Sequence, residues 1–150
     1  MKLRNMTSIY LLCGDEILLL YRRGSRVANN TYISSAGGHF EQDELNDPRR
    51  SMLRELKEEL CLEEMALEAL RLRYITSRLK AGEVRQIYYY FARIADKSLV
   101  KESSEGELEW FKLKDILMLV KKLNMKPLLR RRQYTSPKLM IRNWMEGVLV

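Results

Sequence analysis

Residues 37–62 constrain the fold of this chain more than any other stretch, because they join a glycine pair, an acidic loop and one strongly patterned helix. Asp47 is a favourable N-cap, and the proline after it suits the first helical position. Leucines then recur at helical spacing and form an apolar stripe: Leu53, Leu56 and Leu60. The sequence therefore predicts a helix over residues 48–60.

Three glutamates share another side of this predicted helix. Glu55, Glu58 and Glu59 are separated by helical spacing and project away from the leucine stripe. Like-charged neighbours at this spacing cost about 0.2–0.5 kcal/mol per pair, and carboxylates in a last turn oppose the helix dipole. The cluster is either a solvated helix face or a site for a hard divalent cation such as Mg²⁺, and it does not by itself decide between them.

The loop before the helix favours the cation site. Gly37 and Gly38 allow close backbone approach, so they can offer a bare carbonyl to a metal or bare amides to a phosphate. Glu41, Asp43 and Glu44 add further carboxylates between the glycines and the helix. A solvated helix needs none of these upstream features.

The whole stretch resembles the Nudix box of the Nudix hydrolases, and in particular MutT-like members, whose pattern is G-x5-E-x7-R-E-U-x-E-E-x-G-U with U aliphatic. Gly38 and Glu44 match the front of the pattern, residues 54–59 match its centre, and Leu62 matches the final aliphatic position. Several positions at defined spacing coincide, so the resemblance is specific.

Two positions depart from the family pattern. Nine residues, not seven, separate Glu44 from Arg54, and the additional two fall just before the helix cap. They are expected to lengthen the loop without rotating the helix. Cys61 occupies the family glycine position, where a left-handed conformation would cost a residue with a Cβ about 1–2 kcal/mol.

The resemblance implies an α/β Nudix fold, an α/β/α sandwich with a mixed sheet, formed as a single domain over residues 1–150. It implies a Mg²⁺-dependent hydrolase, with Mn²⁺ as a substitute, that cleaves a phosphoanhydride bond in a nucleoside diphosphate-linked substrate. A nucleoside triphosphate, including an oxidised one such as 8-oxo-dGTP, is the favoured substrate, giving monophosphate and pyrophosphate. The alternatives are a pyrophosphohydrolase of nucleotide sugars, dinucleotides or RNA 5′ ends, and a nucleotide-binding Nudix domain without turnover.

The resemblance also implies roles for individual residues. Arg54 is expected to orient the glutamates, and the general base is Glu55, Glu59 or an acid from a later loop. Glu105 is the preferred later acid and Glu102 the reserve. The implied metal ligands are Gly38, Glu55, Glu58, Glu59 and Glu105. The implied substrate contacts are Arg22, Arg23, His39 and Glu44.

Outside the box, strand patterns predominate. Two apolar runs around Gly14 and Asp15 predict a hairpin, and Ala81-Gly82 predicts a second turn. Further helices are predicted over residues 114–123 and 138–149. The predicted strands cover residues 7–13, 16–22, 30–36, 70–78, 85–95 and 107–113.

Composition narrows the class of protein. The chain has 150 residues, 46% of them hydrophobic, and a net charge of +7 that favours anionic partners. We expect a small-molecule nucleotide as the partner and RNA as the less favoured one, in a monomer or homodimer. Cys13 and Cys61 show no zinc or disulfide pattern. Without an apparent signal peptide or membrane span, the expected location is cytoplasmic.

Overall fold

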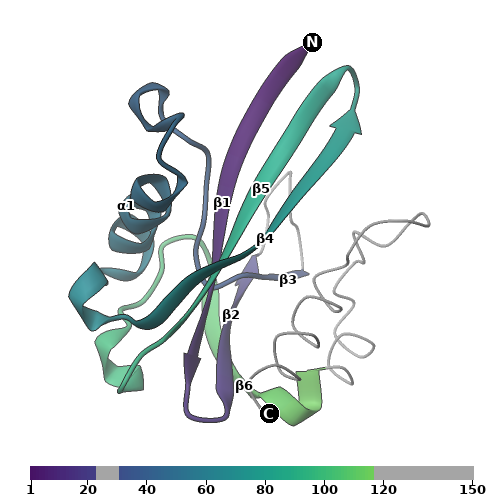
Figure 1. Cartoon of the computed structure of the whole chain (residues 1–150). Helices are drawn as coiled ribbons and strands as arrows, with labels where there is room; N and C mark the ends of the chain where they lie inside the picture. Colours follow the sequence, from purple (N-terminus) through teal and green to yellow (C-terminus); the bar gives the residue numbers. More distant parts are fainter. Residues whose placement is uncertain (23–30, 117–150) are drawn as a thin grey trace.

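The structure, a computed structural model, describes residues 1–22 and 31–116. Within these ranges the chain forms strands, one α-helix and short 3-10 turns (Figure 1). The strands are β1 (Lys2–Cys13), β2 (Glu16–Arg22), β3 (Thr31–Ile33), β4 (Glu68–Lys80), β5 (Glu83–Arg93) and β6 (Glu107–Lys112). The helix is α1 (Pro48–Leu60), and the 3-10 turns are η1 (Gln42–Glu44), η2 (Glu64–Ala66), η3 (Lys97–Leu99) and η4 (Leu113–Asp115).

The described strands form one mixed sheet, as predicted. The order is β3-β2-β1-β5-β4, with β6 paired to the other side of β2. β1 runs parallel to β5, whereas β4 runs antiparallel to β5 and β2 runs antiparallel to β1. Figure 1 shows that the start of β1, the end of β4 and the start of β5 project beyond the rest of the sheet. The N-terminus lies beside the turn between β4 and β5.

Side chains of the central strands alternate between two apolar clusters on opposite faces of the sheet. On one face Ile9 and Tyr90 pack with Leu56 of α1. On the other, Tyr10 stacks on Phe91 with ring centroids 5.1 Å apart. Helix α1 therefore covers one face, and we call the opposite one the far face.

Helix α1 has the predicted bounds because both of its ends are capped. The Asp47 side chain accepts a hydrogen bond from the Arg50 backbone N–H at 3.0 Å. Of the predicted stripe, Leu56 and Leu60 are fully buried, whereas Leu53 is half-buried at the side of the cluster. Met52, outside the predicted stripe, is also fully buried. The helix ends at Cys61, which adopts the left-handed conformation with φ 55° and ψ 30°.

Each predicted strand overlaps a strand of the structure, and β2 has both of its predicted bounds. β1 begins at Lys2 instead of residue 7, because its parallel pairing with β5 continues back to Glu83, the first residue of β5. β4 and β5 meet at the predicted turn, where Ala81 and Gly82 both have positive φ, 51° and 73°. The predicted strand at 30–36 is shorter and spans only Thr31–Ile33.

Two predicted helices fall largely outside the described residues. Of the one predicted over 114–123, the structure describes the start, where Leu113–Asp115 forms a 3-10 turn. The one predicted over 138–149 lies wholly outside. No helix within residues 1–22 and 31–116 is long and apolar enough to cross a membrane. The α/β class with a mixed sheet is confirmed, while the second helical layer of the sandwich stays a prediction.

Replacing Cys61 with glycine should stabilise the protein. A residue with a Cβ is strained at φ 55°, whereas glycine is not, and part of the gain is offset by the flexibility of glycine in the unfolded chain. We expect Cys61→Gly to raise the free energy of unfolding by about 1 kcal/mol, measured by urea denaturation. Cys61→Ala keeps the Cβ and is the matched control; an equal gain from alanine would contradict the explanation.

Candidate active site

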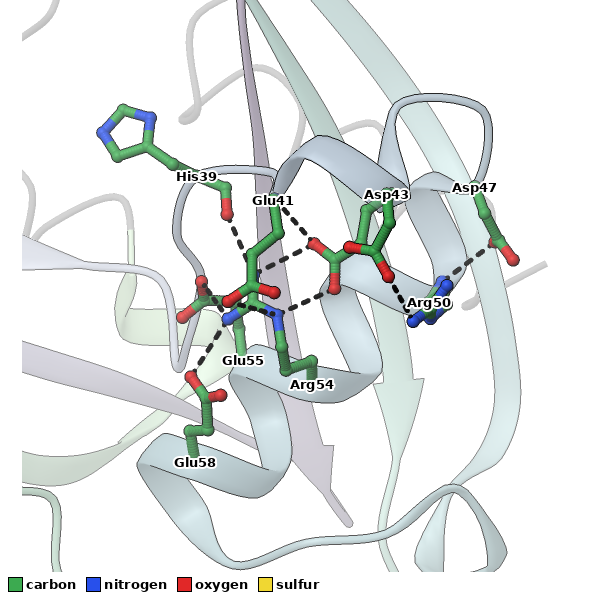
Figure 2. A network of polar contacts seen from close by, with 9 residues as sticks. His39, Glu41, Asp43, Asp47, Arg50, Arg54, Glu55 and Glu58 are labelled. Carbon is green, nitrogen blue, oxygen red and sulfur yellow. Dashed lines mark hydrogen bonds and ion pairs between the residues drawn. The ribbon is translucent and has the colours of Figure 1, made fainter.

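The guanidinium of Arg54 in α1 is the centre of the candidate site (Figure 2). Its Nε and Nη2 donate to the two carboxylate oxygens of Glu44 at 2.8 and 3.1 Å. Glu44 is only 1% exposed, and the hydrogen bond from Arg54 lowers the pKa of its carboxyl to about 2. Glu44 is therefore ionised throughout the physiological range and anchors Arg54.

The same guanidinium also holds two glutamates of the helix. Its Nη1 donates to Glu55 at 2.9 Å and to Glu58 at 3.0 Å, while Nη2 donates to the backbone carbonyl of His39 at 2.9 Å. Figure 2 shows these groups converging on Arg54 from the helix and from the loop before it. One cation thus compensates the repulsion that the glutamate spacing creates.

The longer loop does not prevent Glu44 from reaching Arg54. The chain tightens into η1, where the Glu44 N–H donates to the Glu41 carbonyl at 3.1 Å. In return, the Glu44 carboxylate accepts from the Glu41 N–H at 3.0 Å. Leu45 follows with 56% of its surface exposed. The two additional residues therefore lie between η1 and α1, on the solvent side of the loop.

The two glycines of the pair have different close contacts, with backbone at Gly37 and with a side chain at Gly38. A Cβ on Gly38 would lie 2.3 Å from a carboxylate oxygen of Glu55, and one on Gly37 would lie 2.3 Å from the Thr7 carbonyl oxygen. The Gly37 N–H donates to Glu59 at 3.1 Å. The Gly38 carbonyl accepts from the Thr7 N–H at 2.8 Å, which leaves its second lone pair for another partner.

The two half-buried glutamates resist ionisation. Burial raises the pKa of Glu59 to about 7, and the charges of Glu55 and Glu105 add to the effect. Burial likewise raises the pKa of Glu55, against the opposing hydrogen bond from Arg54. The site therefore contains carboxylates that a further positive charge would stabilise in the ionised form.

Pairing of β2 with β6 brings the later acid close to the helix glutamates. Tyr21 pairs with Glu107, so the end of β2 lies beside the loop that carries Glu105. Glu105 forms an ion pair with Arg22. A Cβ on Gly106 would lie 2.2 Å from the Tyr21 carbonyl oxygen, so this close approach also depends on a glycine.

The donor set fits a hard divalent cation. Glu55, Glu58, Glu59 and Glu105 have carboxylate oxygens, the kind of ligand that Mg²⁺ prefers. Among residues 1–22 and 31–116 no three acidic, histidine or cysteine side chains are already gathered around one point. The reason is visible in the contacts: Arg54 holds Glu55 and Glu58, and the Gly37 amide holds Glu59.

The four predicted substrate contacts have different surroundings. Arg22 faces Glu105, and both oxygens of Glu44 are bound to Arg54. The ring of His39 points away from the glutamates (Figure 2), and its pKa is lowered by burial and by the nearby charges of Arg4 and Arg85. Arg23 lies outside the described residues. Their roles toward substrate stay predictions.

Two contacts of the site were not anticipated from the sequence. The Gly37 amide that holds Glu59 carries no signal beyond the glycine itself. The Arg22–Glu105 pair joins residues 83 positions apart, and only the register of β2 with β6 brings them together. Glu102, the reserve acid, lines a cavity of about 500 Å³ together with Lys101 and Trp110.

Comparison with known proteins gives a consistent result. The model of the NUDIX domain matches residues 2–132 of the chain. No curated protein sequence matches it.

Solved structures share the fold at low sequence identity. A Caenorhabditis elegans Ap4A hydrolase in a binary complex is 15% identical with a TM-score of 0.67, covering 97% of this chain and 98% of its own. A MutT protein from Methanosarcina mazei Go1 is 17% identical with a TM-score of 0.67, covering 98% and 96%. A MutT protein from Bacillus halodurans is 22% identical with a TM-score of 0.59, covering 85% and 83%.

Removing the charge of Glu44 should destabilise the fold. Glu44→Gln leaves the Arg54 guanidinium without its buried partner, and we expect a loss of about 2–3 kcal/mol at pH 7. Because the folded pKa of Glu44 is lowered to about 2, this stability is present above the unfolded value of 4.5 and lost as pH falls through 2. Denaturation of both proteins from pH 7 down to 3 should show the difference narrowing. The exposed Asp43→Asn is the matched control, and a loss as large as that of Glu44→Gln would contradict this account.

Glu59 should have the opposite effect in the absence of metal. Its folded pKa is raised to about 7, so the protonated form favours folding; this contribution is complete below 4.5 and is lost as pH rises through 7. In EDTA at pH 8, Glu59→Gln should be more stable than wild type by about 1–2 kcal/mol, after allowing for solvent screening. The difference should vanish near pH 4.5. Equal stability of the two proteins at pH 8 would show that the ionised Glu59 carboxylate is not destabilised by its surroundings.

Proposed function

The chain belongs to the NUDIX domain family of hydrolases that act on phosphoanhydride bonds, and on this premise we propose that it is a Mg²⁺-dependent hydrolase of a nucleoside triphosphate. The products are the nucleoside monophosphate and pyrophosphate. One observation carries the proposal: Glu55 and Glu59 lie half-buried on one side of α1, with the pKa of Glu59 raised by burial and by its acidic neighbours Glu55 and Glu105.

The metal would be held by carboxylates that already lie around the glycine pair. Glu59 accepts a hydrogen bond from the Gly37 amide, and the charge of Glu105 raises its pKa. Glu55 lies against Gly38. Glu58 would complete the carboxylate set, together with the free lone pair of the Gly38 carbonyl. When bound, Mg²⁺ neutralises charge on the phosphate oxygens and lowers the pKa of water.

Glu55 is the carboxylate that we assign as general base, with Glu59 as a ligand. Burial raises the pKa of Glu55 and, further, that of Glu59, so the pKa alone does not choose between them. Glu59 is already bound by the Gly37 amide and faces the charge of Glu105, which suits it to hold a cation.

The Oε1 atom of Glu55 accepts from Arg54 at 2.9 Å, and the contact with Gly38 limits its movement. Arg54 therefore acts as a positioning residue, because its guanidinium is occupied by glutamates and by the His39 carbonyl.

The substrate phosphates would meet Arg22. Arg22 forms an ion pair with Glu105, and metal binding by Glu105 would free its guanidinium for phosphate oxygens. Glu105 would then pair with the metal and Arg22 with the substrate, so that each charged group keeps a partner of opposite charge when a polyphosphate binds. Arg23 and the ring of His39 are the further substrate contacts that we propose.

A dinucleoside polyphosphate is the second candidate substrate. It is favoured by the likeness to an Ap4A hydrolase across nearly the full length of both chains, with a TM-score of 0.67. This substrate offers the same phosphoanhydride bonds with a second nucleoside. We further propose that the protein works in the cytoplasm, as a monomer or homodimer; Cys13 and Cys61 are free thiols, as a reducing compartment favours.

The test is turnover of a nucleotide panel with the products separated by ion-exchange chromatography, because dinucleoside polyphosphates and nucleotide sugars release neither phosphate nor pyrophosphate. The panel holds nucleoside triphosphates, 8-oxo-dGTP, dinucleoside polyphosphates, nucleotide sugars and 5′-triphosphate RNA. We expect turnover of a triphosphate that EDTA abolishes, and a fall in kcat of about 100-fold or more in Glu55→Gln and Glu59→Gln. Both variants should also weaken Mg²⁺ binding, because Glu55 and Glu59 both belong to the carboxylate set that would hold the metal.

Glu63→Gln is the matched control, because Glu63 is exposed, pairs with Lys57 just past the helix, and should leave kcat unchanged. Turnover that survives both box variants would disprove the site. Mg²⁺-dependent nucleotide binding without any turnover would identify a binding domain instead of an enzyme.

A further inference from the structure

A cluster of cations lies on the projecting part of the sheet, formed by the outer parts of β1, β5 and β4. The strand registers place Arg4 opposite Arg85, and Arg85 opposite Arg78. In the next row Lys2 lies opposite Glu83, and Glu83 opposite Lys80. Cross-strand partners project to the same side of a sheet. Five cations and one carboxylate therefore share one surface, which we call the cationic face: Lys2, Arg4, Arg78, Lys80, Glu83 and Arg85.

Strand alternation assigns the cationic face to the far face of the sheet. Arg4 and Tyr10 are an even number of residues apart in β1, as are Arg85 and Phe91 in β5. Tyr10 and Phe91 stack in the apolar cluster that contains no residue of α1. The cationic face therefore lies on the opposite side of the sheet from the helix that carries the glutamates.

The charges of this surface are only partly balanced. Glu83 pairs with Arg4 at 3.2 Å and with Arg85 at 2.9 Å, so one carboxylate serves two guanidinium groups. Arg78 and Lys80 on the edge strand are exposed, and the Arg4 side chain is 41% exposed. Like charges directly opposite one another destabilise a sheet. A polyanion laid across the rows would remove this repulsion.

The cationic face continues toward the loop of the candidate active site. A cavity of about 250 Å³ is lined by Lys2, Arg4 and the box-loop residue His39, and the charges of Arg4 and Arg85 act on the His39 ring. The proposed hydrolysis of a nucleotide uses none of the five cations. Their arrangement in two rows over three strands is larger than the phosphate group of a mononucleotide needs.

We propose that the cationic face binds the phosphate backbone of a single-stranded nucleic acid. Lysine and arginine side chains on neighbouring strands contact successive phosphates, and association is driven by release of the counterions that they displace. Half-buried apolar side chains form the next row of the same surface, where Met6 lies opposite Ile87, and provide a surface on which bases can rest. This binding is separate from the proposed hydrolysis and needs no metal.

The distribution of apolar side chains favours a nucleic acid over an anionic membrane. A membrane-binding surface combines cations with protruding apolar residues on the same side. Here the exposed apolar side chains of the projecting strands, Leu3, Ile75 and Leu79, alternate with the cations and lie on the opposite side of the sheet. The apolar side chains on the same side as the cations, Met6 and Ile87, are half-buried and do not protrude.

The test measures fluorescence anisotropy of a labelled 5′-hydroxyl single-stranded RNA or DNA of about 16 nucleotides. EDTA is present, so that a metal-dependent site takes no part. The full-length protein should bind both oligonucleotides, with an affinity that falls steeply between about 50 and 200 mM salt. The double variant Arg78→Gln/Lys80→Gln should bind about ten-fold more weakly, and its dependence of log K on log salt should be shallower by about 1.4.

The matched control is Arg49→Gln/Lys57→Gln, which removes the same charge from helix α1, where Arg49 pairs with Glu64 and Lys57 with Glu63. It should bind oligonucleotide nearly as well as wild type. Both double variants should retain their melting temperature and mononucleotide turnover, because Arg78 and Lys80 are exposed residues of an edge strand. Equal weakening in the two double variants would overturn the proposal, as would binding to phosphatidylserine vesicles without binding to oligonucleotide.

Discussion

The interaction on which the site depends is the contact of one guanidinium with five oxygen atoms of four residues. Arg54 binds both oxygens of Glu44, one oxygen each of Glu55 and Glu58, and the carbonyl of His39. Arginine suits this position because its planar donors can serve several carboxylates at once. Since Glu44 is buried and fully ionised, it keeps Arg54 in place while the more exposed Glu58 stays free to change partner. The glutamates can therefore share one helix face without unfolding it.

The sheet contributes the second constraint, which is the distance between the glycine pair and the helix. The loop is attached to β1 by bridges of Met6 with His39 and of Ile9 with Ala36. These bridges hold Gly37 where its N–H reaches Glu59, and Gly38 against the carboxylate of Glu55. The backbone thereby contributes an amide and a carbonyl to a site that is otherwise built from side chains. A loop that was not paired with β1 could not hold the two groups there.

Charge is separated in this molecule by the register of its strands. Carboxylates gather between α1 and the loop with Glu105, while cations gather on the far face of β1, β5 and β4. The net charge of +7 reports only the balance between them. The acidic site favours cations and the cationic face favours phosphates, so each surface needs a partner of opposite charge. The acidic site suits a divalent cation with a nucleotide, and the cationic face suits the phosphate backbone of a nucleic acid.

Local signals in the sequence determined helix α1, the hairpin of β1 with β2 and the turn at Ala81-Gly82, because caps, periodicity and glycine act between near neighbours. The matched spacing of the box also identified the family. Only the tertiary structure decided that Glu44 is buried against Arg54, that Arg22 meets Glu105, and that the pKa of Glu59 is raised. Burial and cross-strand register join residues far apart in the chain, and no pattern of near neighbours encodes them.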